Sequence, residues 1–165
     1  MRFRIEQSFS APVERVEAAL VDPAWYEAVT ASEAVWAPEL LEVEGDGGPR
    51  IGLRVRYRFR GRLNPAAARV VDPGRLSWVE VSTLQRDSHT IEMRVEPDSY
   101  ADKLRFSGSI VLKPEGPVTR RGLDGEVRIR FPLVGGKVES AVVSGLREHA
   151  AVEEAVFSDF VASTR

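Results

Sequence analysis

The chain has 165 residues, of which 43% are hydrophobic and 29% are charged, and its formal net charge is -2. This balance is typical of one ordinary globular domain and unlike that of a disordered or fibrous chain. The charge provides no overall positive field, which argues against nucleic acid and anionic membranes as partners. Because the chain has no cysteine, disulfides, thiolate metal sites and a cysteine nucleophile are excluded.

The sequence also indicates a compartment and a kind of genome. Residues 1–6 lack the apolar run of a signal peptide, and no stretch approaches the ~20 apolar residues of a membrane span. We therefore expect a cytoplasmic protein with no stable membrane insertion. Lysine occurs only at positions 103, 113 and 137, and every other basic residue is arginine, a usage typical of a GC-rich bacterial genome.

The start of the chain predicts a strand followed by two short helices. Residues 2–9 alternate polar and apolar side chains, the period of a strand with one buried face. Pro12 suits a first helical turn and precedes apolar residues at helical spacing. Asp22-Pro23 ends this helix, because proline disfavours helical geometry in the residue before it, and a second short helix is expected around Trp25.

From there to about Phe131 the chain reads as strands separated by turns. The clearest strand runs from Ile51 to Arg60 and alternates apolar residues with arginines. Further strands are expected at 67–71, 76–84, 90–95, 104–113 and 119–131. Short strands joined by tight turns imply antiparallel pairing.

The faces of these strands are only partly defined by the sequence. We expect the arginines between Ile51 and Arg60 to point to solvent and to pair with glutamates on other strands. The glutamates available for this are Glu80, Glu92, Glu96 and Glu126. The sequence does not decide which face of the strand at 76–84 is buried. Trp78 and Leu84 favour one face as the inner one, and Val79 and Val81 favour the other.

The last thirty or so residues change to a helical period. At ~100° per residue, one apolar stripe contains Val138, Val142, Gly145, His149, Val152, Val156 and Phe160. This predicts one long amphipathic helix over about 136–162. The order of elements predicts a single α+β domain spanning 1–165, in which a curved antiparallel sheet wraps around a long C-terminal α-helix.

This order of elements, with the opening segment Phe9-Ser10-Ala11-Pro12-Val13-Glu14-Arg15-Val16, resembles the START-like (SRPBCC) helix-grip superfamily of lipid-transfer domains, plant pathogenesis-related allergens and polyketide cyclases. More narrowly, segments 100–102 and 131–139 are similar to an actinobacterial branch labelled only as a domain of unknown function. The resemblance covers nearly the whole chain, and these segments are family fingerprints rather than catalytic motifs, so the resemblance assigns no reactive residue. It implies a deep cavity for an apolar or amphipathic ligand between sheet and helix.

His149 is the polar residue at the centre of the apolar helix stripe. An imidazole facing such a cavity could bind the polar end of a ligand or exchange protons. The alternative is a buried neutral histidine that is bonded to a backbone carbonyl or to water. The other histidine, His89, lies in an expected turn, and we assign it no function.

Other patterns have structural explanations beside functional ones. Gly135-Gly136-Lys137 opens the last helix and could hold a phosphate, but the same glycines suit a sharp turn from strand to helix. No metal-binding or nucleophile motif occurs, so we expect no metal, no cofactor and no identified catalytic residue.

The leading hypothesis is non-enzymatic binding or carriage of a small hydrophobic or amphipathic ligand, lipid-like or polyketide-like, in a cavity of at least several hundred Å³. The residues expected to line it are Phe3, Tyr57, Phe59, Phe106, Ile110, Val127, Ile129, Val142, His149 and Val152. One alternative is a cyclase-type or dehydratase-type enzyme with His149 as acid or base, which needs a second polar group that the sequence does not identify. Another is an interaction module with a filled core. Ligand identity and oligomeric state stay open.

Overall fold

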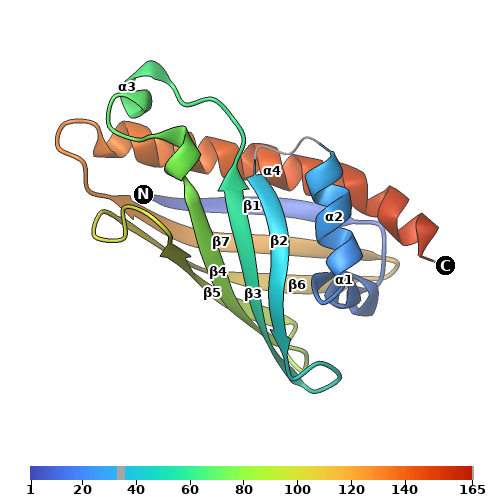
Figure 1. Ribbon diagram of the computed structural model, residues 1–165. Helices are drawn as coiled ribbons and strands as arrows, with labels where there is room; N and C mark the ends of the chain where they lie inside the picture. Colours follow the sequence, from blue (N-terminus) through green and yellow to red (C-terminus); the bar gives the residue numbers. More distant parts are fainter. Residues whose placement is uncertain (33–35, 165) are drawn as a thin grey trace.

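A seven-stranded antiparallel sheet wraps around one long helix in the computed structural model, which describes residues 1–32 and 36–164 (Figure 1). The strand order is β1-β7-β6-β5-β4-β3-β2. The strands are β1 (Arg2–Phe9), β2 (Trp36–Glu44), β3 (Arg50–Phe59), β4 (Ser77–Gln85), β5 (Thr90–Pro97), β6 (Leu104–Glu115) and β7 (Val118–Ile129). The expected α+β helix-grip architecture is confirmed.

The helices occupy one side of the sheet and its ends. They are α1 (Val13–Leu20), α2 (Pro23–Ala31), α3 (Pro65–Ala68) and α4 (Gly135–Ser163), with a short 3-10 helix at Pro73–Arg75. The two short helices after β1 and the long C-terminal helix are therefore confirmed. Within the described residues, no helix has the length and apolar character needed to cross a membrane.

The strand expected at 67–71 is wrong, because this segment begins as a helical turn. Asn64 Oδ1 accepts a hydrogen bond of 2.9 Å from the Ala67 amide, and Pro65 occupies the first turn. Both features favour a helix start. The buried residues Ala67 and Val71 are spaced by one helical turn, and the Val71 amide donates to the Ala67 carbonyl at 2.9 Å.

The pairing of β3 with β4 decides which side chains face the interior. Val55 pairs with Glu80 and Tyr57 pairs with Trp78, so Trp78 and Glu80 share the inner face with them. The expectation that Glu80 pairs with arginines on the outer face is wrong. The reason is the period of two along β4, which places Glu80 on the same side as Trp78.

The outer-face assignment of the arginines on β3 is confirmed. Arg54 pairs with Glu96 at 3.0 Å, and Arg58 pairs with Glu39 at 2.7 Å. All four of these side chains are well exposed, so each pair contributes little to stability.

The long helix α4 is held at both ends. At its start, a Cβ on Gly135 would lie 2.5 Å from the Ile129 carbonyl oxygen, which gives this glycine a structural role in the turn. Toward its end, the Phe157 ring packs on Phe9 and Trp25, with ring centroids 4.7 and 5.4 Å apart. These anchors place the middle of α4 over the concave face of the sheet.

Candidate functional site

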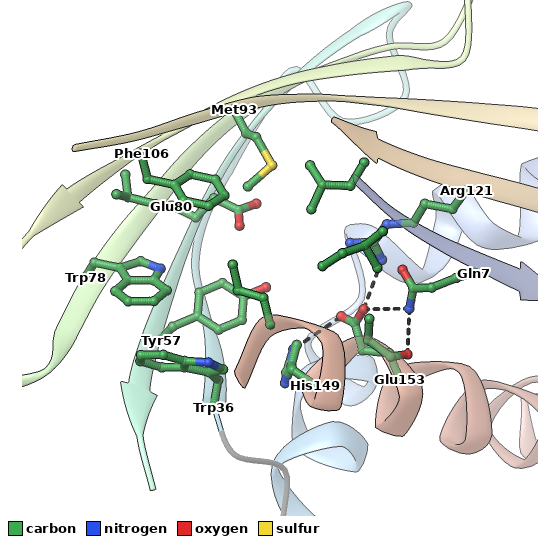
Figure 2. A pocket seen from close by; sticks show the side chains of 15 residues that line it. Gln7, Trp36, Tyr57, Trp78, Glu80, Met93, Phe106, Arg121, His149 and Glu153 are labelled. Atoms are coloured by element: carbon green, nitrogen blue, oxygen red, sulfur yellow. Dashed lines mark hydrogen bonds and ion pairs between the residues drawn. The ribbon is translucent and has the colours of Figure 1, made fainter. Parts of the chain in front are cut away.

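A small interior cavity lies between the middle of α4 and the concave face of the sheet (Figure 2). Its volume is about 50 Å³. This is smaller than the expected cavity of several hundred Å³. The difference arises because large aromatic side chains fill much of the space.

One wall of the cavity is aromatic. The Trp36 and Trp78 rings are 4.2 Å apart between centroids, and Trp36 also packs on Phe59 at 4.9 Å. Phe106 and Tyr57 extend this wall, and the Tyr57 ring meets the His149 imidazole edge-on at 5.7 Å. An aromatic wall with polar tips suits a flat, mainly apolar ligand.

The cavity is also lined by five polar side chains, which we call the interior polar cluster: Gln7, Glu80, Arg121, His149 and Glu153. Arg121 Nη1 lies 3.1 Å from Glu153 Oε2. Gln7 Nε2 donates to the same carboxylate oxygen at 3.2 Å and to the Ala150 carbonyl at 2.7 Å. Strands β1 and β7 supply Gln7 and Arg121 as direct neighbours, while α4 supplies Glu153 (Figure 2).

His149 is only 6% exposed and lies one helical turn before Glu153. Its Nε2 is 3.5 Å from Glu153 Oε1, close enough for an ion pair when the imidazole is protonated. Neither ring nitrogen has a hydrogen-bond partner among the described residues. The part of the alternative in which a backbone carbonyl satisfies this histidine is therefore wrong, while the part in which water does so stays open. Among the described residues only the Glu153 carboxylate approaches the ring nitrogens, and the remaining hydrogen-bonding capacity is available to a ligand or to water.

The two acids of the interior polar cluster have opposite electrostatic environments. Burial raises the pKa of Glu80 to about 7, against the effect of Arg121 and with the help of the Glu153 charge. Burial also disfavours the charged form of Glu153. However, Arg121, with smaller contributions from His149 and Gln7, outweighs it and lowers the pKa of Glu153 to about 2. Two carboxyl groups with separated pKa values are typical of acid–base sites.

A second, smaller space lies on the other side of these acids. Its volume is about 30 Å³, and it reaches Trp25 and Tyr26 of α2. Both spaces share four residues, namely Tyr57, Glu80, Arg121 and Glu153. Burial raises the pKa of Tyr57 well above its ordinary value, so its hydroxyl keeps its proton. The polar side chains therefore separate two small, otherwise apolar spaces.

The structure brings some of the expected cavity residues together and leaves others in the packed core. Tyr57, Phe106 and His149 line the first space, and Tyr57 and Ile110 line the second. The residues that line neither space are Phe3, Phe59, Val127, Ile129, Val142 and Val152. They pack in or against the hydrophobic core, where Val127 is fully buried and Phe59 covers Trp36.

Sequence reasoning did not assign Glu80, Arg121 or Glu153 to the site. Arg121 has the same strand parity as Leu123, so the pattern already placed it on the buried face. Glu153 follows His149 by one helical turn and belongs to the inner side of α4. Buried positions for charged residues were the signal that could have found them. Among residues 1–32 and 36–164, no group of three or more metal-ligating side chains could hold a metal ion.

Solved structures with the same architecture are known from several organisms. The aromatase/cyclase Zhui from Streptomyces sp. R1128 has a TM-score of 0.68 and 16% identity, over 100% of this chain and 96% of its own. Norcoclaurine synthase from Thalictrum flavum, in complex with dopamine and hydroxybenzaldehyde, has a TM-score of 0.62 and 16% identity, over 100% and 88%. A START superfamily protein from Mycobacterium smegmatis has a TM-score of 0.60 and 15% identity, over 96% and 98%.

At these identities the likeness shows the fold, and it confirms the START-like helix-grip assignment. A comparison with curated protein sequences found no significant match. A family model described as "Protein of unknown function (DUF2505)" matches residues 4–161. The chain therefore belongs to the DUF2505 family and carries its START-like, helix-grip fold.

Proposed function

We propose that the protein binds a small, mainly apolar ring compound that carries a polar group, with the ring against the aromatic wall and the polar group facing His149. The observation that carries this proposal is a buried imidazole beside a cavity, whose ring nitrogens have no hydrogen bond among the described residues and only a 3.5 Å approach of Nε2 to Glu153. A buried polar group without a partner is costly, by ~1–3 kcal/mol, and a ligand hydrogen bond would recover this.

The size of the cavity favours a compact ligand. A space of about 50 Å³ has room for the equivalent of a few water molecules and none for a long acyl chain. Met93 also lines the space, and its flexible side chain can adapt to a ring. The dopamine and hydroxybenzaldehyde bound to norcoclaurine synthase are compact aromatic molecules of this kind.

The binding proposal is tested with two neighbouring alanines of α4. Ala150 lines the cavity and is buried, whereas Ala151 is exposed. Native mass spectrometry of freshly purified protein would identify a retained ligand, and calorimetric titration with para-hydroxyphenylpropionate would measure binding. We expect saturable binding that Ala150→Leu abolishes and Ala151→Leu preserves. No retained ligand together with no saturable binding would favour the interaction module with a filled core.

A second candidate function is acid–base catalysis on the bound compound, of the cyclase or dehydratase type. The enzyme hypothesis lacked a second polar group, and Glu80 in the same cavity supplies one, with a pKa of about 7. A carboxyl group that titrates near neutrality can both donate and accept a proton at working pH. In this mechanism Glu80 donates a proton to the bound compound or accepts one from it. His149 orients the compound, and Glu153 remains an anion.

The catalytic candidate has its own test. The ligand recovered by native mass spectrometry is incubated with wild type and with Glu80→Gln, and its mass and structure are followed over time. Conversion by wild type and unconverted binding by Glu80→Gln would support catalysis. An unchanged ligand in both samples would leave carriage as the function.

A further inference from the structure

The sheet has a gap along the line between β5 and β6. The two strands pair from Thr90 with Val111 to Arg94 with Ser107, and within the described residues no pair follows. Strand β5 nevertheless continues to Pro97 on β4, and β6 begins at Leu104 on β7. Figure 1 shows the β1-β7-β6 part of the sheet and the β4-β3-β2 part running in different directions.

Two side chains at this gap border both the interior cavity and the outer surface of the sheet. Val95 and Phe106, one from each strand, line the interior cavity and also line a groove on the outer side of the sheet. The two side chains lie just beyond the last pair of the ladder, where no backbone hydrogen bond ties β5 to β6 in the described chain. At this point, therefore, side chains rather than paired backbone separate the interior cavity from the outer groove.

The outer groove is rich in arginine. It is lined by Arg94, Arg105, Arg128 and Arg130, and by the acids Glu96 and Glu126. Arg94 pairs with Glu96 at 2.7 Å, and Arg128 pairs with Glu126 at 2.9 Å. Arg105 and Arg130 are exposed and have no ion pair among the described residues. The mouth of the gap therefore carries a local positive charge, although the whole chain has a net charge of -2.

We propose that the gap between β5 and β6 is the entrance to the interior cavity, and that it selects small aromatic acids whose anionic group stays with Arg105 and Arg130. This inference rests on the proposed binding function. The ring of the ligand passes between Val95 and Phe106 to reach the aromatic wall, and a polar group on its far end meets His149. Guanidinium groups at the mouth bind a carboxylate through charge-assisted hydrogen bonds, and their field speeds its arrival.

The selectivity is tested with two probes that share the ring and chain length and differ in the terminal group, the anionic para-hydroxyphenylpropionate and the neutral alcohol para-hydroxyphenylpropanol. The gap variant is Arg105→Glu with Arg130→Glu. The control is Arg50→Glu with Arg147→Glu, which makes the same charge change at exposed arginines outside the groove. We expect the acid to bind wild type and the control roughly tenfold more tightly than the alcohol, and this preference to disappear in the gap variant.

The route is tested by association kinetics. Val95→Ala widens the gap, whereas Val111→Ala changes an exposed valine of β6 outside the groove. Stopped-flow measurement of the tryptophan signal should show a severalfold faster association for Val95→Ala and no change for Val111→Ala. An unchanged rate in Val95→Ala means that the ligand enters elsewhere and overturns the route.

The outcomes separate the entrance from the binding function. Binding of both probes to wild type with equal affinity, or an acid preference that survives in the gap variant, overturns the selective entrance and leaves the proposed function intact. Failure of both probes to bind wild type contradicts the proposed function. It also contradicts the proposed entrance, which rests on that function.

Discussion

His149 lies one helical turn before Glu153, and its Nε2 is 3.5 Å from Glu153 Oε1. The other oxygen of the same carboxylate is held by Arg121 and Gln7. Glu153 is thus a fixed anion at the base of the cavity, while the imidazole makes no hydrogen bond among the described residues beyond this long approach of Nε2 to Glu153.

Replacing His149 by leucine should affect binding more than stability. The change removes a buried polar ring without a protein hydrogen-bond partner, at similar side-chain volume, so the melting temperature should stay the same or rise. Affinity for para-hydroxyphenylpropionate should fall by ~1 kcal/mol or more, the value of a lost ligand hydrogen bond. Thermal unfolding and calorimetric titration of the variant measure both effects. A lower melting temperature with unchanged affinity would show that His149 serves the fold alone.

Replacing Arg121 by methionine should destabilise the protein strongly. The variant leaves the Glu153 carboxylate buried without its cationic partner, which costs about 3–5 kcal/mol of unfolding free energy. Arg58→Met breaks an exposed pair with Glu39 and should cost only ~0–1 kcal/mol. Urea unfolding of both variants checks the difference. Similar losses in the two would show that the interior pair is no more important than a surface pair.

Glu80 should make the protein less stable as pH rises toward neutrality. The folded chain holds the Glu80 proton up to a pKa of about 7, whereas the unfolded chain releases it near its ordinary value of 4.5. The folded state therefore binds more protons between these values, and the free energy of unfolding falls across the window. The charges that face Glu80 from neighbouring elements are those of Arg121, Glu153 and, when protonated, His149.

The measurement compares Glu80→Gln with wild type by urea unfolding at about pH 5 and about pH 8. The variant cannot ionise, so it should gain ~1–3 kcal/mol relative to wild type between the two conditions. Glu92→Gln, at an exposed position on β5, serves as the control and should change little. If both variants respond alike to pH, the burial of Glu80 does not control its ionisation.

The two glycines at the start of α4 should respond in opposite ways to alanine. A Cβ on Gly135 would lie 2.5 Å from the Ile129 carbonyl, so Gly135→Ala should lower stability by ~1–3 kcal/mol. A Cβ on Gly136 meets nothing within 4 Å, so Gly136→Ala should raise stability by about 0.5–1 kcal/mol through helix propensity. Thermal unfolding of the two variants and wild type measures both changes in stability. Unchanged stability in Gly135→Ala would contradict the structural explanation for this glycine. The anion site at the helix start would then be the explanation that is left.

The sequence by itself determined the elements and most of their faces. Alternation along β1 and β3 and the helical stripe of α4 are local patterns, and each appears in the structure close to its expected bounds. One exception is the segment after Asn64, where a single cap outweighed the apolar run, and the sequence pattern also defined no separate strand at Trp36–Glu44. A short turn of helix depends on one side-chain hydrogen bond, which a periodicity count does not register.

Tertiary structure alone decided the candidate site. The parity of β4 was known, but only its pairing with β3 placed Trp78 and Glu80 inside, because a shift of one residue would have turned both outward. Likewise, Gln7 meets Glu153 across 146 residues of chain. The small cavity and the gap between β5 and β6 follow from how aromatic rings pack and where a ladder ends. Both are relations between distant segments, and the hydrophobic period of one segment carries no information about them.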